Sequence, residues 1–283
     1  MSATTVIGAG VMGRGIALVF ARAGHATTLY DLDSDTLGAA QRYVEDFLAR
    51  SVEKQKLSAA DRDATLARFT YTSDPKAIRG SFILEAVPER LDLKHQVLGE
   101  AAAQNPPDTI LASNTSTLPI TRIAAGVPYP ERVVGMHFFN PAPLMKLVEV
   151  IAGAETSPAV RDHTYALAAA LGKRPVHAQD SPGFIVNRVA RQFYLESLRT
   201  VEQSGTDVET LDRLMRSSGF RMGPFELMDL IGVETNHAVS QSMFEAFFFQ
   251  ETFRPSRLQQ QKVDAGHHGR KTGQGFYPYA SET

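Results

Sequence analysis

Residues 8–13 read Gly-Ala-Gly-Val-Met-Gly, and this stretch decides the fold of the first part of the chain. It follows a short apolar run, Thr4–Ile7, which predicts a strand, and it opens a helical stretch, Val11–Ala23. A second apolar run, Ala26–Tyr30, predicts the next strand. A G-x-G-x-x-G sequence between a strand and a helix is the fingerprint of a dinucleotide-binding βαβ unit. We therefore expect the chain to bind a dinucleotide at this turn.

Each glycine of the turn has a physical role in that prediction. Gly8 permits the tight turn, Gly10 has no side chain to obstruct a pyrophosphate, and Gly13 lets the helix pack closely against the sheet. The first residues of the helix, Val11 and Met12, contribute free N–H groups and the positive end of the helix dipole to the anion. The alternative is a glycine-rich turn without a ligand.

An acidic residue at the end of the second strand favours NAD over NADP. Asp31 lies 18 residues after Gly13. Its carboxylate accepts hydrogen bonds from a ribose diol and repels a 2′-phosphate. Arg14 is a complication, because it either reaches a phosphate and weakens this preference or points into solvent.

Composition excludes several classes of function. The 283 residues carry 29 Lys and Arg against 31 Asp and Glu, so the basic excess typical of a nucleic-acid-binding protein is missing. The absence of cysteine excludes disulfides, a thiolate nucleophile and Cys-ligated zinc, and we expect no metal. We also expect no membrane partner and a cytoplasmic location, since neither a secretory signal nor an apolar run of roughly 18–20 residues is present.

The pattern of elements changes near Asp180-Ser181-Pro182-Gly183. Before it, further strands are predicted at Ser81–Val87, Thr109–Ala112, Arg132–Phe138 and Leu144–Ile151, with helices at Asp33–Lys56, from Ser58 and at Pro158–Leu171. After it, only helices are predicted, at Phe184–Gln203, Val208–Arg216, Pro224–Leu230, Glu234–Phe249 and Ser256–Ala265. We predict an α/β fold: a Rossmann-type, mostly parallel sheet domain at 1–180, followed by an all-helical C-terminal domain at 181–283.

Further motifs follow the glycine turn in a fixed order along the chain. They are Ala112–Ser116, His137–Pro141, Met145–Val150, Ser181–Arg188, Gly223–Leu227 and Gly269–Tyr277. This ordered set resembles the L-3-hydroxyacyl-CoA dehydrogenases, in particular the bacterial 3-hydroxybutyryl-CoA dehydrogenases, over residues 4–279. The resemblance implies NAD as the cofactor, an acyl-CoA substrate and a place in fatty acid or butanoate metabolism.

Oxidation of a secondary alcohol needs a base for the hydroxyl proton, and His137 suits that task because an imidazole exchanges protons near neutral pH. Glu149 follows 12 residues later. If their strands are antiparallel neighbours joined by the turn at 140–143, the carboxylate fixes the ring and stabilises its charged form. The resemblance assigns the pair these catalytic roles. The alternatives are a structural histidine and, from the alternation with Val148 and Val150, an exposed acid on an edge strand.

The resemblance implies roles for further residues. Ser116 and Asn187 are implied around the substrate and in catalysis, with Asn187 contributed by the helical domain and Ser116 also near the cofactor. The implied cofactor-side residues are Glu89, Lys94, Asn140 and Lys271. Lys54 is implied in binding the CoA phosphates, although Phe47 replaces a serine that contacts CoA in the family. From composition alone, Glu89, Lys94, Lys54 and Lys271 would be interpreted as solvated charges.

We expect NAD-dependent interconversion of a (3S)-3-hydroxyacyl-CoA, with 3-hydroxybutyryl-CoA as the expected substrate, and a 3-oxoacyl-CoA. One alternative is a related dehydrogenase of a free hydroxy acid or sugar acid, and another is a non-catalytic NAD-binding protein. The family dimerises through its helical domain, and the aromatic stretch Met243–Phe249 exceeds what one helix face buries. A homodimer is therefore expected.

Overall fold

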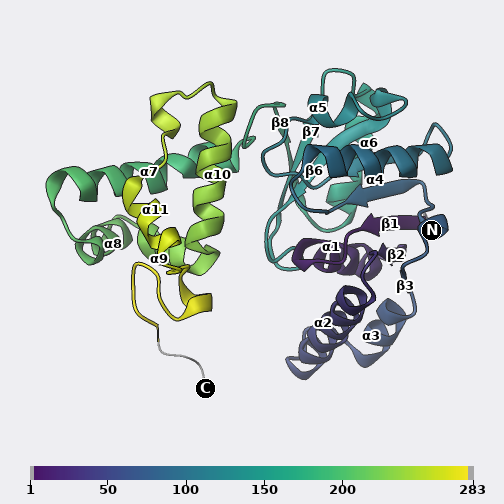
Figure 1. The fold of residues 1–283 in the computed structure, drawn as a ribbon. Helices are drawn as coiled ribbons and strands as arrows, with labels where there is room; N and C mark the ends of the chain where they lie inside the picture. The colour runs from purple at the N-terminus through teal and green to yellow at the C-terminus, as the bar shows by residue number, and fades with distance from the viewer. Residues whose placement is uncertain (1–2, 280–283) are drawn as a thin grey trace. The chain divides into compact units, whose positions relative to one another are not determined.

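The computed structural model describes residues 3–279, which divide into one compact unit up to Phe184 and a second from Ile185 (Figure 1). The first unit contains an eight-stranded sheet in the order β3-β2-β1-β4-β5-β6-β7-β8. The strands are β1 (Ala3–Ile7), β2 (Ala26–Tyr30), β3 (Phe69–Thr72), β4 (Phe82–Glu85), β5 (Ile110–Ser113), β6 (Val133–Phe138), β7 (Leu147–Ala152) and β8 (Arg174–Ala178). Neighbouring strands are parallel except β6 and β7, so the predicted mostly parallel sheet is confirmed.

Helices cover both faces of this sheet. Residues of α1 (Val11–Arg22), α2 (Ser34–Glu53) and α6 (Pro158–Ala170) share one apolar core with one face of the strands. Residues of α4 (Leu91–Gln104) and α5 (Ile120–Ala124) form a second core on the other face. The remaining helical segments are α3 (Ala59–Leu66), η1 (Pro75–Ala77) and η2 (Pro130–Arg132).

The strand order reverses direction between β1 and β4, and in open sheets of this kind ligands bind outside the carboxyl ends of the strands at that point. Strands β3 and β8 were not predicted from the sequence. Both contain mostly half-buried or exposed residues, because they lie at the two edges of the sheet. They therefore lack the continuous apolar run that marks a central parallel strand.

The second unit is helical, as predicted. Its segments are α7 (Val186–Ser204), α8 (Val208–Ser217), α9 (Pro224–Ile231), α10 (Val233–Ala246), η3 (Glu251–Phe253), α11 (Arg257–Asp264) and η4 (Arg270–Thr272). Helix α10 ends before the predicted Phe249, because Phe248 and Phe249 have left-handed φ angles of 54° and 62°. No helix between residues 3 and 279 is both long and apolar enough to cross a membrane. The cytoplasmic location stays a prediction.

Candidate active site

The glycine turn has the form that a dinucleotide requires. Gly8 has a φ of 97°, and its N–H donates to the carbonyl of Tyr30 at 2.8 Å. A Cβ on Gly13 would lie 1.7 Å from the Gly8 carbonyl oxygen, so only glycine allows this approach of helix to turn. A Cβ on Gly10 would meet nothing within 4 Å, which leaves open space at the start of α1, where Val11 and Met12 begin the helix. These features fit a pyrophosphate at the helix N-terminus.

The carboxylate of Asp31 is fixed beside this turn by backbone N–H groups. Oδ2 accepts from Ala9 at 2.7 Å, and Oδ1 accepts from Asp33 at 3.0 Å. Both oxygens keep further acceptor capacity for ribose hydroxyls, because an ionised carboxylate has about four acceptor sites. The guanidinium of Arg14 stacks over the ring of Tyr43 at 4.4 Å, and its effect on the preference for NAD stays a prediction.

His137 and Glu149 lie directly opposite each other on β6 and β7. The expected antiparallel pairing is therefore confirmed, and Nδ1 of His137 lies 2.7 Å from Oε2 of Glu149. The interpretation of Glu149 as an exposed edge acid is wrong, because β8 pairs with β7 and the residue is 0% exposed. Opposite residues of an antiparallel pair point to the same face, which brings the imidazole and the carboxylate together.

The His137–Glu149 pair leaves one nitrogen of the imidazole available for proton transfer. Since Nδ1 is bound to Glu149, Nε2 is the ring nitrogen that remains to exchange a proton with a substrate. The rings of Phe139 and Phe184 lie 4.5 and 5.7 Å from the imidazole, centroid to centroid. The imidazole therefore has an apolar surround and one fixed anionic partner, an arrangement suited to a general base.

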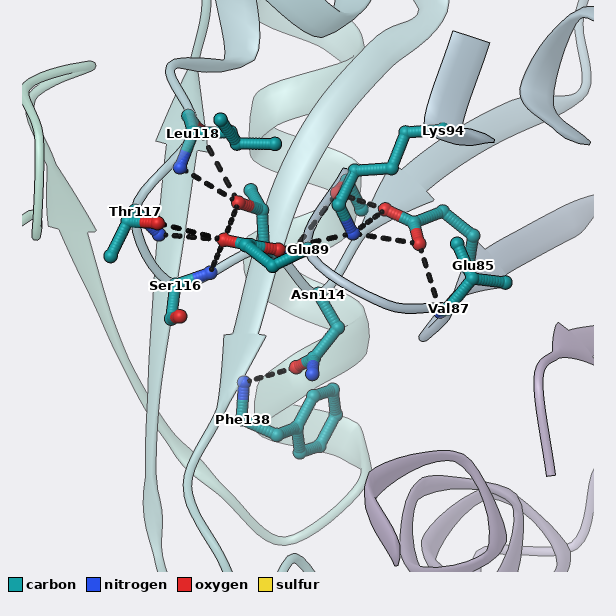
Figure 2. Close-up of polar contacts among 11 residues, drawn as sticks. Glu85, Val87, Glu89, Lys94, Asn114, Ser116, Thr117, Leu118 and Phe138 are labelled. Atoms are coloured by element: carbon teal, nitrogen blue, oxygen red, sulfur yellow. Dashed lines mark hydrogen bonds and ion pairs between the residues drawn. The ribbon is translucent and has the colours of Figure 1, made fainter. Parts of the chain in front are cut away.

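The loop that carries Ser116 is held by one carboxylate oxygen. Figure 2 shows Glu89 between this loop and Lys94. Oε1 of Glu89 accepts from the N–H groups of Ser116 and Thr117, both at 2.9 Å, and from Oγ1 of Thr115 at 2.6 Å. Burial alone would raise the pKa of Glu89, but Lys94 and these hydrogen bonds outweigh burial and hold the pKa below its usual value. Glu89 is thus an anion that fixes the backbone at Ser116.

Lys94 is not a solvated charge, contrary to the interpretation from composition, since its side chain is 1% exposed. Its ammonium donates to both oxygens of Glu85, at 2.8 and 3.0 Å, and lies 3.3 Å from Oε2 of Glu89 (Figure 2). Glu85 is fully buried and also accepts from Ser113 Oγ and from Val87 N–H. Lys94 therefore connects Glu85 to Glu89.

Glu85 and Asn114 were not identified as site residues from the sequence. Glu85 ends the apolar strand Phe-Ile-Leu-Glu, and a charge in such a run is the signal that could have identified it. Oδ1 of Asn114 accepts from the N–H of Phe138 at 2.8 Å, which joins the end of β5 to the end of β6 beside His137. The sequence signal for a structural role of Asn114 is weaker, because asparagine is common after a strand.

The remaining predicted residues lie elsewhere in the two units. In the first unit, Asn140 is exposed just after β6, and Lys54 caps α2 beside a pocket of about 380 Å³ whose lining includes Phe47. In the second unit, Asn187 is half-buried in the first turn of α7, and Lys271 forms an ion pair with Glu234. The approach of Asn187 and Lys271 to the substrate and cofactor stays a prediction.

The turn at Gly8–Gly13 and the buried imidazole–carboxylate pair are features that fit one class of protein, the NAD-dependent oxidoreductases that act on a CH–OH group. Two family models divide the chain between them. The 3-hydroxyacyl-CoA dehydrogenase NAD binding domain matches residues 3–181, and the 3-hydroxyacyl-CoA dehydrogenase C-terminal domain matches residues 183–279. The chain belongs to the 3-hydroxyacyl-CoA dehydrogenase family.

Individual relatives agree with this assignment. The 3-hydroxyadipyl-CoA dehydrogenase of Escherichia coli (strain K12) is 43% identical over 98% of this chain, which spans 59% of that relative's length. A 3-hydroxybutyryl-CoA dehydrogenase of Mycobacterium tuberculosis is 36% identical over 97% of both chains. The crystal structure of 3-hydroxybutyryl-CoA dehydrogenase from Escherichia coli K12 superposes with a TM-score of 0.96 at 43% identity, covering 99% of this chain and 60% of that chain.

Proposed function

We propose that this chain catalyses the NAD-dependent oxidation of (3S)-3-hydroxyacyl-CoA to 3-oxoacyl-CoA and the reverse reaction. The observation that carries the proposal is the 2.7 Å contact between His137 Nδ1 and Glu149 Oε2 at the carboxyl end of β6. This contact orients an imidazole at the sheet edge where ligands bind in open α/β folds.

The chain's own residues supply the proton chemistry. Nε2 of His137 takes the proton of the substrate hydroxyl, and Glu149 stabilises the imidazolium that forms. NAD, when bound, supplies the acceptor for the hydride. In the reverse direction, the imidazolium returns its proton to the oxygen of the 3-oxo group. Ser116 and Asn187 donate hydrogen bonds to the substrate oxygen in this proposal.

The glycine turn and Asp31 would hold the pyrophosphate and the adenosine ribose of NAD, respectively. By resemblance to the family, Glu89, Lys94, Asn140 and Lys271 border the nicotinamide side. Lys54 would bind the CoA phosphates, because its pocket also contains the cations Arg50 and Lys56. The names of the relatives support a substrate with a short acyl chain, either 3-hydroxybutyryl-CoA or a dicarboxylic relative such as 3-hydroxyadipyl-CoA.

Consumption of NADH tests this function. With acetoacetyl-CoA and NADH we expect steady turnover, and with acetoacetyl-CoA and NADPH we expect little. With free acetoacetate, which lacks the CoA contacts, kcat/KM should be at least about a hundredfold lower than with acetoacetyl-CoA. Equal use of the free acid would favour the alternative of a hydroxy-acid or sugar-acid dehydrogenase. Cofactor binding without turnover of any acyl-CoA would favour a non-catalytic protein.

We also propose that the second unit forms a homodimer. Phe248 is 91% exposed and Phe249 is 67% exposed, and the two residues are adjacent in the chain just after α10. Exposed aromatic residues that adjoin one another are typical of association surfaces. Light scattering at micromolar concentration should give twice the chain mass of 30.9 kDa, and a mass near 30.9 kDa would contradict the proposal.

A further inference from the structure

Arg191 is a buried cation in the second unit. It lies on α7 and is 2% exposed. Its Nη1 donates to the carbonyl oxygen of Asn236 at 2.8 Å, to the Asn236 side-chain oxygen at 3.1 Å and to Ser240 Oγ at 2.9 Å. All of these partners are uncharged, and among residues 3–279 no carboxylate forms an ion pair with Arg191. A buried charge without a countercharge is costly, so a fold rarely keeps one without a reason.

One edge of the guanidinium has no protein partner. Nε is buried and forms no hydrogen bond, and no hydrogen bond from Nη2 occurs within the described part of the chain. The Nε–Nη2 edge presents two parallel N–H groups, the arrangement that binds both oxygens of a carboxylate. Burial lowers the pKa of Arg191 to about 10, which still leaves the group positively charged at neutral pH. The free edge therefore has the charge and the geometry for a carboxylate ligand.

The position of Arg191 on α7 relates it to the proposed substrate site. Asn187 precedes it by four residues on the same helix, so the two side chains share a face about 6 Å apart along the axis. Asn187 is the residue proposed to bind the oxygen on C3 of the acyl chain. In a six-carbon dicarboxylic acyl group, the terminal carboxylate lies three bonds beyond C3, a reach comparable with one helical turn.

We propose that Arg191 binds the terminal carboxylate of a dicarboxylic 3-hydroxyacyl-CoA and thereby sets the substrate specificity of this enzyme. This inference rests on the proposed function and names the class of acyl chain that the same site accepts. A monocarboxylic chain of equal length reaches the same position with a methyl group, and it leaves the Nε–Nη2 edge of Arg191 without a partner.

Two substrates of equal chain length test the proposal in the wild-type protein. We expect kcat/KM for 3-hydroxyadipyl-CoA to exceed that for 3-hydroxyhexanoyl-CoA by about 10- to 100-fold, the scale of a charge-assisted hydrogen bond. Equal values would overturn the role of Arg191 while leaving the dehydrogenase activity established. Failure to oxidise either substrate would instead overturn the proposed function, so the two failures are distinguishable.

Substitutions of Arg191 test whether this residue causes the preference for the dicarboxylic substrate. Arg191→Met should lose about 10- to 100-fold in kcat/KM on 3-hydroxyadipyl-CoA, mainly through KM, and change less than about threefold on 3-hydroxyhexanoyl-CoA. Arg191→Lys keeps the positive charge but loses the two parallel N–H donors of the guanidinium, so its kcat/KM on 3-hydroxyadipyl-CoA should lie between those of the wild type and Arg191→Met. Arg199→Met is the matched control, because Arg199 lies on the same helix and pairs with Glu196. An equal loss on both substrates in Arg191→Met would show a purely structural link between helices and would contradict the proposal.

Discussion

Replacement of Glu85 by glutamine tests the connection between the buried charges and the Ser116 loop. Glu85 is 0% exposed and takes two hydrogen bonds from the Lys94 ammonium, at 2.8 and 3.0 Å. After Glu85→Gln, the 1%-exposed Lys94 keeps one carboxylate, Glu89, at 3.3 Å. Breaking a buried ion pair from one side costs about 3–5 kcal/mol when the remaining charge loses every partner, and because Lys94 keeps Glu89 the loss should lie at the lower end of this range. That is a large part of the roughly 5–15 kcal/mol by which a domain is stable.

Urea unfolding followed by circular dichroism measures this loss. The midpoint of unfolding should fall in Glu85→Gln, and it should stay within the error of the wild type in Glu100→Gln, since Glu100 is exposed on α4. The double variant Glu85→Gln/Lys94→Met removes both charges and should recover part of the loss. Turnover should fall in Glu85→Gln as well, because Lys94 also holds Glu89. If the free energy of unfolding of Glu85→Gln lay within about 1 kcal/mol of the wild-type value, the Glu85–Lys94 pair would not stabilise the fold as proposed.

Two further predictions concern Asp31 and Lys173. Asp31→Ser removes the charge that would repel a 2′-phosphate, so kcat/KM with NADPH should rise relative to NADH by at least about tenfold; an unchanged ratio would contradict the assigned role. Lys173 donates to the carbonyls of Ala142 and Met145, at 2.6 and 2.9 Å, and burial with nearby cations lowers its pKa to about 8. The unfolded chain therefore keeps this proton to higher pH than the native state. The free energy of unfolding of the wild type, relative to that of Lys173→Met, should rise from pH 8 towards pH 10. If the difference between the two free energies did not change with pH, the prediction would be wrong.

The central sheet was predictable because its strands are continuous apolar runs separated by helical patterns. Edge strands β3 and β8 were not, since half-exposed strands lack that signal. The His137–Glu149 pair was accessible from sequence only through the hairpin hypothesis and the family pattern. Strand alternation alone predicted an exposed Glu149, because it ignores a further strand that covers an edge.

The charges that support the site were harder to predict. Lys94 and Glu89 stand near a helix start, where solvated charges are common, and only the fold shows that Glu85 approaches them from β4. Arg191 was missed for a similar reason. Arg188 on the same helix is exposed, and the burial of Arg191 follows from its contacts with α10, which are formed by residues more than 40 positions away.

His137 is proposed to be the base that takes the hydroxyl proton, and the turnover of the His137→Gln variant decides whether it has this role. Glutamine preserves the size and polarity of the side chain but cannot take the hydroxyl proton. With 3-hydroxybutyryl-CoA and NAD at saturation, kcat should fall by at least about a hundredfold, while the Kd of NADH from its fluorescence stays within about twofold of the wild type. A variant that binds NADH normally and keeps most of its turnover would contradict the role of His137 as the base.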